Sequence, residues 1–193
     1  MKAKHVLFFS MVCLLAISLG AGEKEALDSR SAADDDLQFR SNAQPAGQCF
    51  NFHYAAEAVP LSFNHCFPAP FEQICGFGAL PSQVQIGDIT GDLSSIVTSQ
   101  RPSGRGATHY GLMHYFSDGQ GNTFWTEDRA VCAPAGKNPY VCRVNDVMKI
   151  AGGTGVFAQA NGSVRNHGII DLSDLSNPKL SIDLRGRICG DGL

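Results

Sequence analysis

From Gln48 onward, short runs of β-branched and aromatic residues alternate with turn-forming residues. This texture is typical of an all-β domain, in which each run is a strand. The clearest alternation covers residues 180–188, where leucine, isoleucine or glycine occupies every even position and serine, aspartate or arginine every odd one. That is the period of a half-buried strand. The whole pattern predicts strands at residues 49–54, 73–77, 84–99 (with a break), 108–116, 122–131, 140–150, 162–171 and 179–189.

One turn fixes how two of these strands pair. Asp118-Gly119-Gln120-Gly121 separates two aromatic-rich runs. Glycine permits the positive φ that tight hairpins need, so residues 108–116 and 122–131 should pair antiparallel. About eight short strands without a long helix fit either an up-and-down β-barrel or a sandwich.

The N-terminal segment is different. A start with two lysines, an apolar run at residues 6–19 and small residues at 20–22 have the order of a secretory signal peptide. The apolar run is shorter than the roughly 20 residues that cross a bilayer. Residues 23–47 are polar and predict a flexible tail. We therefore expect a signal peptide at 1–22, a tail at 23–47 and one domain at 48–193 that is secreted or periplasmic, with no stable membrane insertion after cleavage.

The composition supports a hydrophobic core and argues against nucleic acid as a partner. Hydrophobic residues make up 44% and charged residues 17% of the 193 positions. The formal net charge is −3, and no lysine and arginine cluster is present to follow a phosphate backbone. Nucleic-acid binding is therefore not expected.

Seven cysteines become six once Cys13 leaves with the signal peptide. An even number in an exported chain predicts disulfides, although six cysteines allow many connectivities. No C-x-x-C pair suggests zinc or redox chemistry. Two pairs flank short proline-containing loops, so the spacing favours Cys132–Cys142, Cys66–Cys75 and, for the remaining two, Cys49–Cys189.

A glycine-rich stretch, I-A-G-G-T-G-V-F-A-Q-A-N-G-S-V, covers residues 150–164. It lacks the lysine of a phosphate loop and the later acid of a dinucleotide fingerprint. The structural interpretation is a tight corner formed by Gly152, Gly153 and Gly155, with Phe157 plugging one end of the barrel.

G-G-T-G-V-F followed by A-x-x-x-G-S-V resembles the signature of the allene oxide cyclase barrel proteins and of the related dirigent proteins. Residues 87–93 and 184–189 also resemble that family, so the likeness covers roughly residues 84–189. It implies an all-β fold, an eight-stranded antiparallel up-and-down β-barrel of the calycin-like kind, with a central apolar cavity and often assembled as a homodimer or homotrimer. Allene oxide cyclases guide the ring closure of an unstable epoxide with a barrel-lining carboxylate. Glu57 is not matched to that carboxylate, and no site residue is transferred.

In a barrel, alternate residues of each strand face inward. We expect the more apolar face of residues 108–116 to point inward, rather than the face with His109, Gly111, Met113 and Tyr115. The expected cavity lining is Tyr110, Leu112, His114, Phe116, Phe124 and Asp128. His114 and Asp128 are then candidates for a general acid/base pair. The alternative is that one faces solvent or that each only satisfies backbone groups near a rim.

No metal and no cofactor are expected. His109 and His114 lie five positions apart, so on one strand they point to opposite faces and cannot hold one ion together. No G-x-S-x-G elbow supports nucleophilic catalysis. Asn161-Gly162-Ser163 is a glycosylation sequon if the source is a eukaryote.

Two classes of function fit best. One is a cyclase or isomerase that orients a reactive hydrophobic small molecule in the cavity. The other is a non-catalytic carrier of a hydrophobic ligand. A secreted structural or interaction barrel is the third possibility. A lipocalin would fit a carrier, but its early Gly-x-Trp is missing because Trp125 is the only tryptophan.

Overall fold

The computed structural model describes residues 48–190. Within that range the protein is all-β, with ten antiparallel strands and two short 3-10 turns, Gly104–Gly106 (η1) and Gly155–Phe157 (η2). The predicted all-β class and antiparallel pairing are confirmed. The signal peptide and tail expected at residues 1–47 lie outside the described residues. The strands are β1 (Gln48–Cys66), β2 (Cys75–Ala79), β3 (Ser82–Ile86), β4 (Ile89–Pro102), β5 (Thr108–Ser117), β6 (Thr123–Thr126), β7 (Asp128–Pro134), β8 (Val141–Thr154), β9 (Asn161–Asp171) and β10 (Lys179–Gly190).

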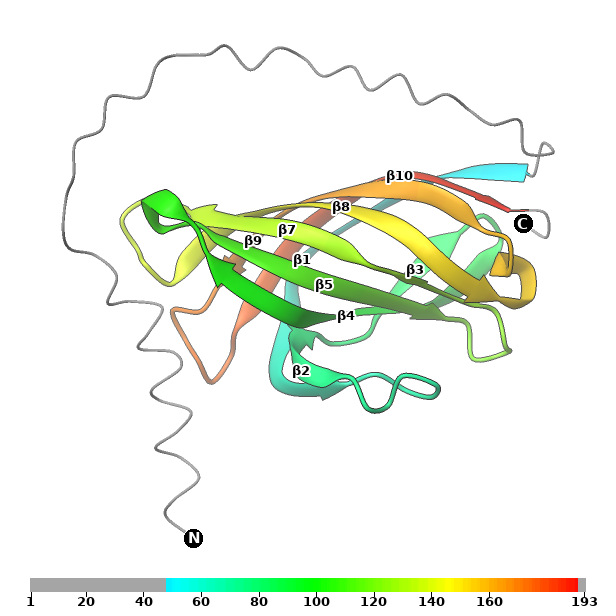
Figure 1. Cartoon of the computed structure of the whole chain (residues 1–193), viewed down its shortest axis with the longest axis horizontal. Coiled ribbons are helices and arrows are strands. Elements are labelled where there is room, and N and C mark those ends of the chain that lie inside the picture. The colour runs from blue at the N-terminus through cyan, green and yellow to red at the C-terminus, as the bar shows by residue number, and fades with distance from the viewer. Residues whose placement is uncertain (1–47, 191–193) are drawn as a thin grey trace, which may run out of the picture. The chain divides into compact units, whose positions relative to one another are not determined.

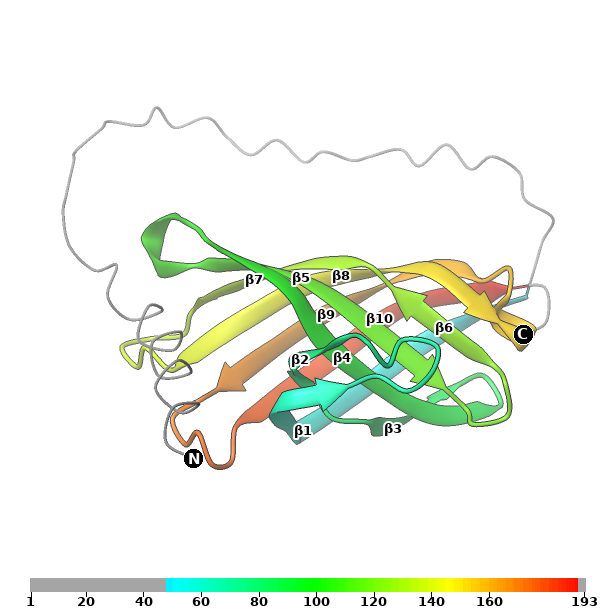
Figure 2. The same cartoon turned by 60° about the horizontal axis from the view of Figure 1, so that its bottom comes forward.

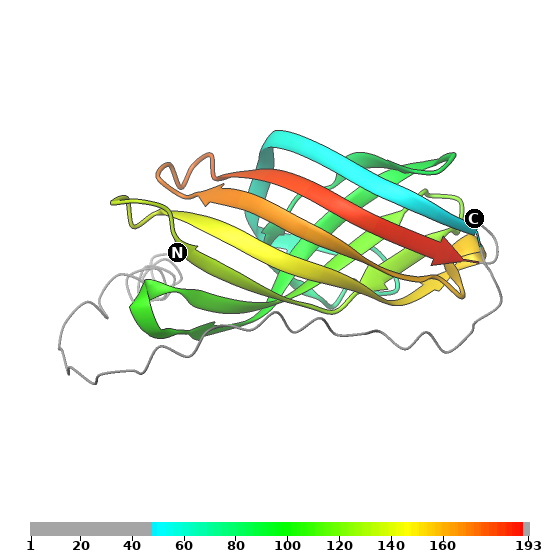
Figure 3. The same ribbon diagram turned by 90° about the horizontal axis from the view of Figure 1, so that it is seen from above.

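The strands form one sheet in the order β2-β1-β10-β9-β8-β6-β5-β4-β3 (Figure 1). β7 continues from β6 and pairs with both β5 and β8. The first strand pairs with the last, from Gln48 opposite Gly190 to Pro60 opposite Lys179. Figure 3 shows β1, β10, β9 and β8 running side by side along the molecule.

The structure has ten strands rather than the predicted eight, because the predicted runs 84–99 and 122–131 are each divided in two. β1 continues far beyond residue 54: it pairs with β10 as far as Pro60, past a register shift between Ala56 and Val59, and then with β2 from Leu61 onward. Ala58 adopts a positive φ of 59° at this irregularity. The break expected in 84–99 lies at Gly87, whose φ of 59° suits the tight turn between β3 and β4.

One side of the sheet encloses an aromatic core. The rings of Phe116 and Phe124 stack at 5.1 Å, and Phe157 lies edge-on to both at 5.4 and 5.3 Å. Phe157 is fully buried and packs with residues of β1, β3, β8, β9 and β10. Such aromatic contacts add to the free energy gained from burying apolar area.

The expected glycine corner needs a correction. Gly152 and Gly153 belong to β8, where they pair with Trp125 and Phe124 of β6. The chain turns only at Gly155, whose positive φ of 58° starts η2. A side chain at Gly152 would collide with the indole of Trp125, so this glycine serves close packing rather than a turn.

A loop between β1 and β2 covers the opposite side of the sheet. Phe71 packs edge-on against Tyr115 and Trp125 at 5.8 and 5.2 Å, and Phe67 lies 5.7 Å from Tyr115. Figure 2 shows this loop crossing in front of β4 and β5. Met113 and Tyr115 on the outward face of β5 are therefore buried, as His114 and Phe116 are on its inward face, whereas His109 and Gly111 are only half-buried.

Three disulfides join Cys49 to Cys189, Cys66 to Cys75 and Cys132 to Cys142. These are the pairs that the spacing favoured. Three disulfides indicate an oxidising environment of the extracellular type. Among residues 48–190, no helix is long and apolar enough to cross a membrane.

Candidate functional site

Polar side chains form a band across the inner face of the sheet. The band consists of five residues on five successive elements: His114 on β5, Thr126 on β6, Asp128 on β7, Asp146 on β8 and Asn166 on β9. Each is at most 6% exposed. Charged and amide groups are rarely buried this deeply unless they are paired or have a function.

Strand register brings the five side chains together. Tyr115 pairs with Trp125, and Leu112 pairs with Asp128, which places His114 beside Thr126. On the next strands Asp146 lies directly opposite Asn166. Directly opposite residues on one face of a sheet have their Cβ atoms about 5 Å apart. The polar band is therefore held by backbone pairing rather than by loops.

His114 and Asp128 form a buried hydrogen-bonded pair. His114 Nδ1 lies 2.8 Å from Asp128 Oδ2, and the two side chains are 8% and 0% exposed. The hydroxyl of Thr126 donates to Asp128 Oδ2, and the backbone amide of Lys149 donates to Asp128 Oδ1 at 2.7 Å. Because both carboxylate oxygens are engaged, Asp128 is fixed in place and orients the imidazole ring.

Thr126 also contacts the backbone and the ring of His114. Its hydroxyl oxygen accepts a hydrogen bond from the backbone amide of His114 at 3.1 Å and lies 3.3 Å from His114 Nδ1. The other ring nitrogen, Nε2, has no hydrogen-bond partner among the described residues. This is the arrangement in which a histidine can exchange a proton with a bound molecule.

Asp146 is the least satisfied member of the band. Neither of its carboxylate oxygens has a hydrogen-bond partner of good geometry, and Asn166 Oδ1 lacks one as well. Burial raises the pKa of Asp146 to about 6. The positive charge of His114 lowers that pKa, the charge of Asp128 raises it, and the backbone amide of Val147 lowers it.

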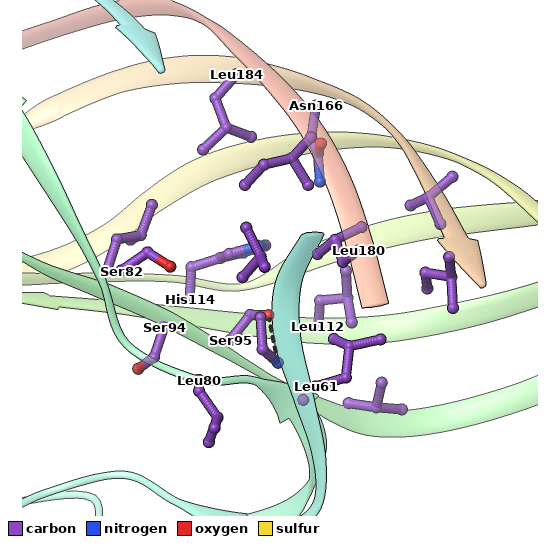
Figure 4. A pocket seen from close by; sticks show the side chains of 18 of the residues that line it. Leu61, Leu80, Ser82, Ser94, Ser95, Leu112, His114, Asn166, Leu180 and Leu184 are labelled. Atoms are coloured by element: carbon purple, nitrogen blue, oxygen red, sulfur yellow. Dashed lines mark hydrogen bonds between the residues drawn. The ribbon is translucent and has the colours of Figure 1, made fainter. Parts of the chain in front are cut away.

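A small cavity adjoins the polar band. It has a volume of about 70 Å³ and is lined mainly by apolar side chains, among them Leu112, Val144, Leu180 and Leu184. His114 and Asn166 point into this space (Figure 4). The volume accommodates about two water molecules, so the enclosed space is small for a central ligand cavity.

The expected lining residues lie on the inner face but have different surroundings. Leu112 and His114 line the cavity. Phe116 and Phe124 belong to the aromatic core, and Tyr110 packs against the cluster around Ala130. Asp128 lies behind His114 and is not part of the cavity wall.

Sequence reasoning did not single out Asp146 and Asn166. Asp146 lies between Val144 and Met148 on the buried face of β8, and Asn166 follows Val164 on the buried face of β9. A polar residue at an inward position of an alternating strand is the signal that could have found them.

Comparisons of this chain with protein-family models, curated proteins and solved structures gave no match. The geometry itself supports two kinds of chemistry. A histidine oriented by a carboxylate can move a proton, and a cluster of buried oxygen acceptors can hold a cation.

Proposed function

We propose that the described domain is a small β-barrel that binds the reacting end of a largely apolar small molecule and isomerises or cyclises it. The glycine-rich resemblance to the allene oxide cyclase and dirigent barrels supports this proposal. The close approach of β2 and β4, near the two ends of the sheet, also supports it. Gly78 of β2 has no room for a side chain against the backbone of Ser95 on β4, and Ala79 donates its amide to Ser95 Oγ at 3.4 Å.

The observation that carries the proposal is the buried pair of His114 and Asp128 beside an apolar cavity. Asp128 holds the ring through Nδ1, which leaves Nε2 to contact a ligand in the cavity. Nε2 removes a proton from one atom of the ligand and returns it to another, so the net reaction needs no external oxidant or reductant. General acid/base catalysis of this kind contributes about 100- to 10,000-fold in rate.

The cavity limits the substrate class. About 70 Å³ accommodates only a few heavy atoms. Aliphatic and aromatic side chains make up most of the wall, so the enclosed part of the ligand is apolar except for the group that meets His114, Asn166 or one of three serines, Ser82, Ser94 and Ser95. The rest of a larger ligand lies outside the enclosed space. Secretion is part of the proposal, and the three disulfides support it.

The first experiment identifies the ligand. Native mass spectrometry of the purified, disulfide-bonded protein is followed by solvent extraction and identification of any retained molecule. We expect one small, largely apolar molecule per binding site. A protein that retains nothing and binds no member of an apolar compound panel would contradict the proposal.

The second experiment separates catalysis from transport. The identified compound, or its less stable isomer, is incubated with the wild type, with His114→Gln and with His53→Gln, which changes an exposed histidine on the outer face. We expect His114→Gln to slow isomerisation at least about 100-fold and to retain binding, while His53→Gln reacts like the wild type. If the compound binds but is recovered unchanged from every protein, the barrel is a carrier.

A further inference from the structure

The unpaired acceptors of the polar band require their own explanation. Asp146 and Asn166 are each 4% exposed and lie opposite one another on β8 and β9. Three of their oxygen atoms, both of Asp146 and Oδ1 of Asn166, have no hydrogen-bond partner of good geometry; for Asp146, the backbone amide of Val147 is a neighbouring donor. Two groups that lie opposite one another and could bond to each other instead both keep acceptors without a well-placed donor. Buried acceptors without a donor are costly, so a donor or a cation is expected between them.

Other potential ligand atoms lie close by. One atom each from His114, Asp128 and Asp146 lie within 4.8 Å of one another, and all three residues are buried. Metal–ligand bonds of about 2.0 to 2.4 Å place ligands on opposite sides of an ion about 4 to 5 Å apart. The cluster therefore has the dimensions of a coordination shell.

The local charge also favours a cation. Two carboxylates are buried here, and His114 is the only charged partner recorded for either of them among residues 48–190. Asp146 itself has no ion pair in this range, although it is nearly inaccessible to solvent. A buried carboxylate without a partner is strongly unfavourable, and coordination of a metal is one of the ways in which proteins compensate for it.

We infer that Asp146, Asn166 and the His114–Asp128 pair form a binding site for one divalent first-row metal ion. Carboxylate and amide oxygens combined with one imidazole suit Mn²⁺ or Zn²⁺ better than Ca²⁺, which prefers oxygen ligands alone. This inference departs from the expectation of no metal, which rested on the spacing of histidines along one strand. The ligands of the inferred site come instead from four different strands that the sheet places side by side.

This inference goes beyond the proposed function and does not depend on turnover. The competing explanation is that Asp146 carries a proton and bonds to Asn166 after a small rotation, with no ion present. The two explanations differ in one measurable property, which is saturable binding of one metal ion.

The test uses the tag-free, disulfide-bonded protein after removal of metals by a chelator. Co²⁺ is titrated in, and its visible d–d absorption reports coordination in the protein. We expect saturation at one equivalent and displacement of Co²⁺ by one equivalent of Zn²⁺. The absence of a saturable site at one equivalent would overturn the inference.

Two variants locate the ion and one controls for surface binding. Asp146→Asn and Asn166→Leu should each weaken Co²⁺ binding, the former by at least about 100-fold, more than is typical for the loss of an outer-shell partner. Asp183→Asn removes the exposed aspartate beside His53 and should bind like the wild type. Near-UV circular dichroism checks that each variant keeps its fold. Wild-type affinity in a folded Asp146→Asn protein, or loss of binding in Asp183→Asn, would contradict the assignment.

The result is independent of the ligand experiments above. Retention of an apolar molecule and isomerisation are measured in the chelator-treated protein. If the protein binds Co²⁺ but no small molecule, the metal site is supported and the proposed function is contradicted. If it binds and isomerises a small molecule but binds no Co²⁺, the proposed function is supported and the metal site is contradicted.

Discussion

Two histidine–aspartate pairs lie on opposite faces of the same sheet. In the inner pair, His114 Nδ1 is 2.8 Å from Asp128 Oδ2, and the side chains are 8% and 0% exposed. In the outer pair, His53 Nε2 is 3.2 Å from Asp183 Oδ1, and the side chains are 58% and 37% exposed. The residue types are identical and the distances are similar, so the two pairs differ mainly in their surroundings.

The partners of each aspartate show what the surroundings change. Asp183 accepts three hydrogen bonds from Arg185, at 2.9, 3.1 and 2.7 Å, but water can replace any of them. Asp128 accepts from Thr126 and from the amide of Lys149 inside the sheet, where water cannot substitute for a lost donor. A histidine–aspartate pair is thus an exchangeable surface contact at His53 and Asp183, and a fixed group inside the protein at His114 and Asp128.

The largest expected effect comes from breaking the inner pair. Asp128→Ala leaves the Lys149 amide, the Thr126 hydroxyl and His114 without their buried acceptor. We expect the free energy of unfolding to fall by about 3 to 5 kcal/mol, measured by urea denaturation. Asp183→Ala is the matched control and should unfold like the wild type. Equal effects of the two substitutions would show that burial does not distinguish the pairs.

The second largest effect concerns Asp146, the member of the polar band whose carboxylate oxygens lack well-placed donors. Because the pKa of Asp146 is raised to about 6, the folded state binds more protons than the unfolded state between the ordinary value of 3.8 and that pH. Stability therefore decreases as the pH rises through this window, by about 3 kcal/mol for a shift of about two pH units. Asp146→Asn removes the charge and should be more stable than the wild type at pH 7.5 in the presence of a chelator.

The difference between these two proteins should vanish near pH 4, where Asp146 of the wild type is protonated. Urea denaturation at several pH values measures it. A stability difference that stays constant from pH 4 to pH 7.5 would contradict the raised pKa. Addition of Zn²⁺ should also reduce the advantage of Asp146→Asn, because a bound ion would stabilise only the protein that keeps its carboxylate.

The sequence predicts the all-β class and two of the five members of the polar band for a definite reason. Alternation along residues 108–116 distinguishes inward from outward positions, so His114 and Asp128 can be paired from the sequence. Two features escape this reasoning. The loop that carries Phe67 and Phe71 buries the second face of β5, and no local pattern reveals that long-range contact. Asp146 and Asn166 meet only through the register of β8 and β9, which pattern alone does not fix.

A smaller effect comes from the hydroxyl that supports the inner pair. Thr126→Val keeps the shape of the side chain but removes the donor to Asp128 and the acceptor for the His114 amide. We expect a loss of about 1 to 3 kcal/mol in the free energy of unfolding. Thr123→Val is the control, because Thr123 bonds to Thr154 in an exposed position on the same strand. A similar loss in both variants would mean that the threonine hydroxyl, and not its burial, is responsible.

The smallest expected effect is the response of the outer pair, His53 and Asp183, to ionic strength. Arg185, through its hydrogen bonds and its charge, and His53 lower the pKa of Asp183, so this aspartate favours folding above its ordinary pKa, and that contribution is lost as the pH falls. The groups are in water, so the contribution is small and should disappear when the ionic strength is raised. Asp183→Asn should therefore have an unchanged Tm at high salt. The loss caused by Asp128→Ala should persist at the same salt concentration, since ions do not reach the inner pair. If salt abolished that loss as well, the interior would be open to solvent, and the argument for a fixed acid/base pair would fail.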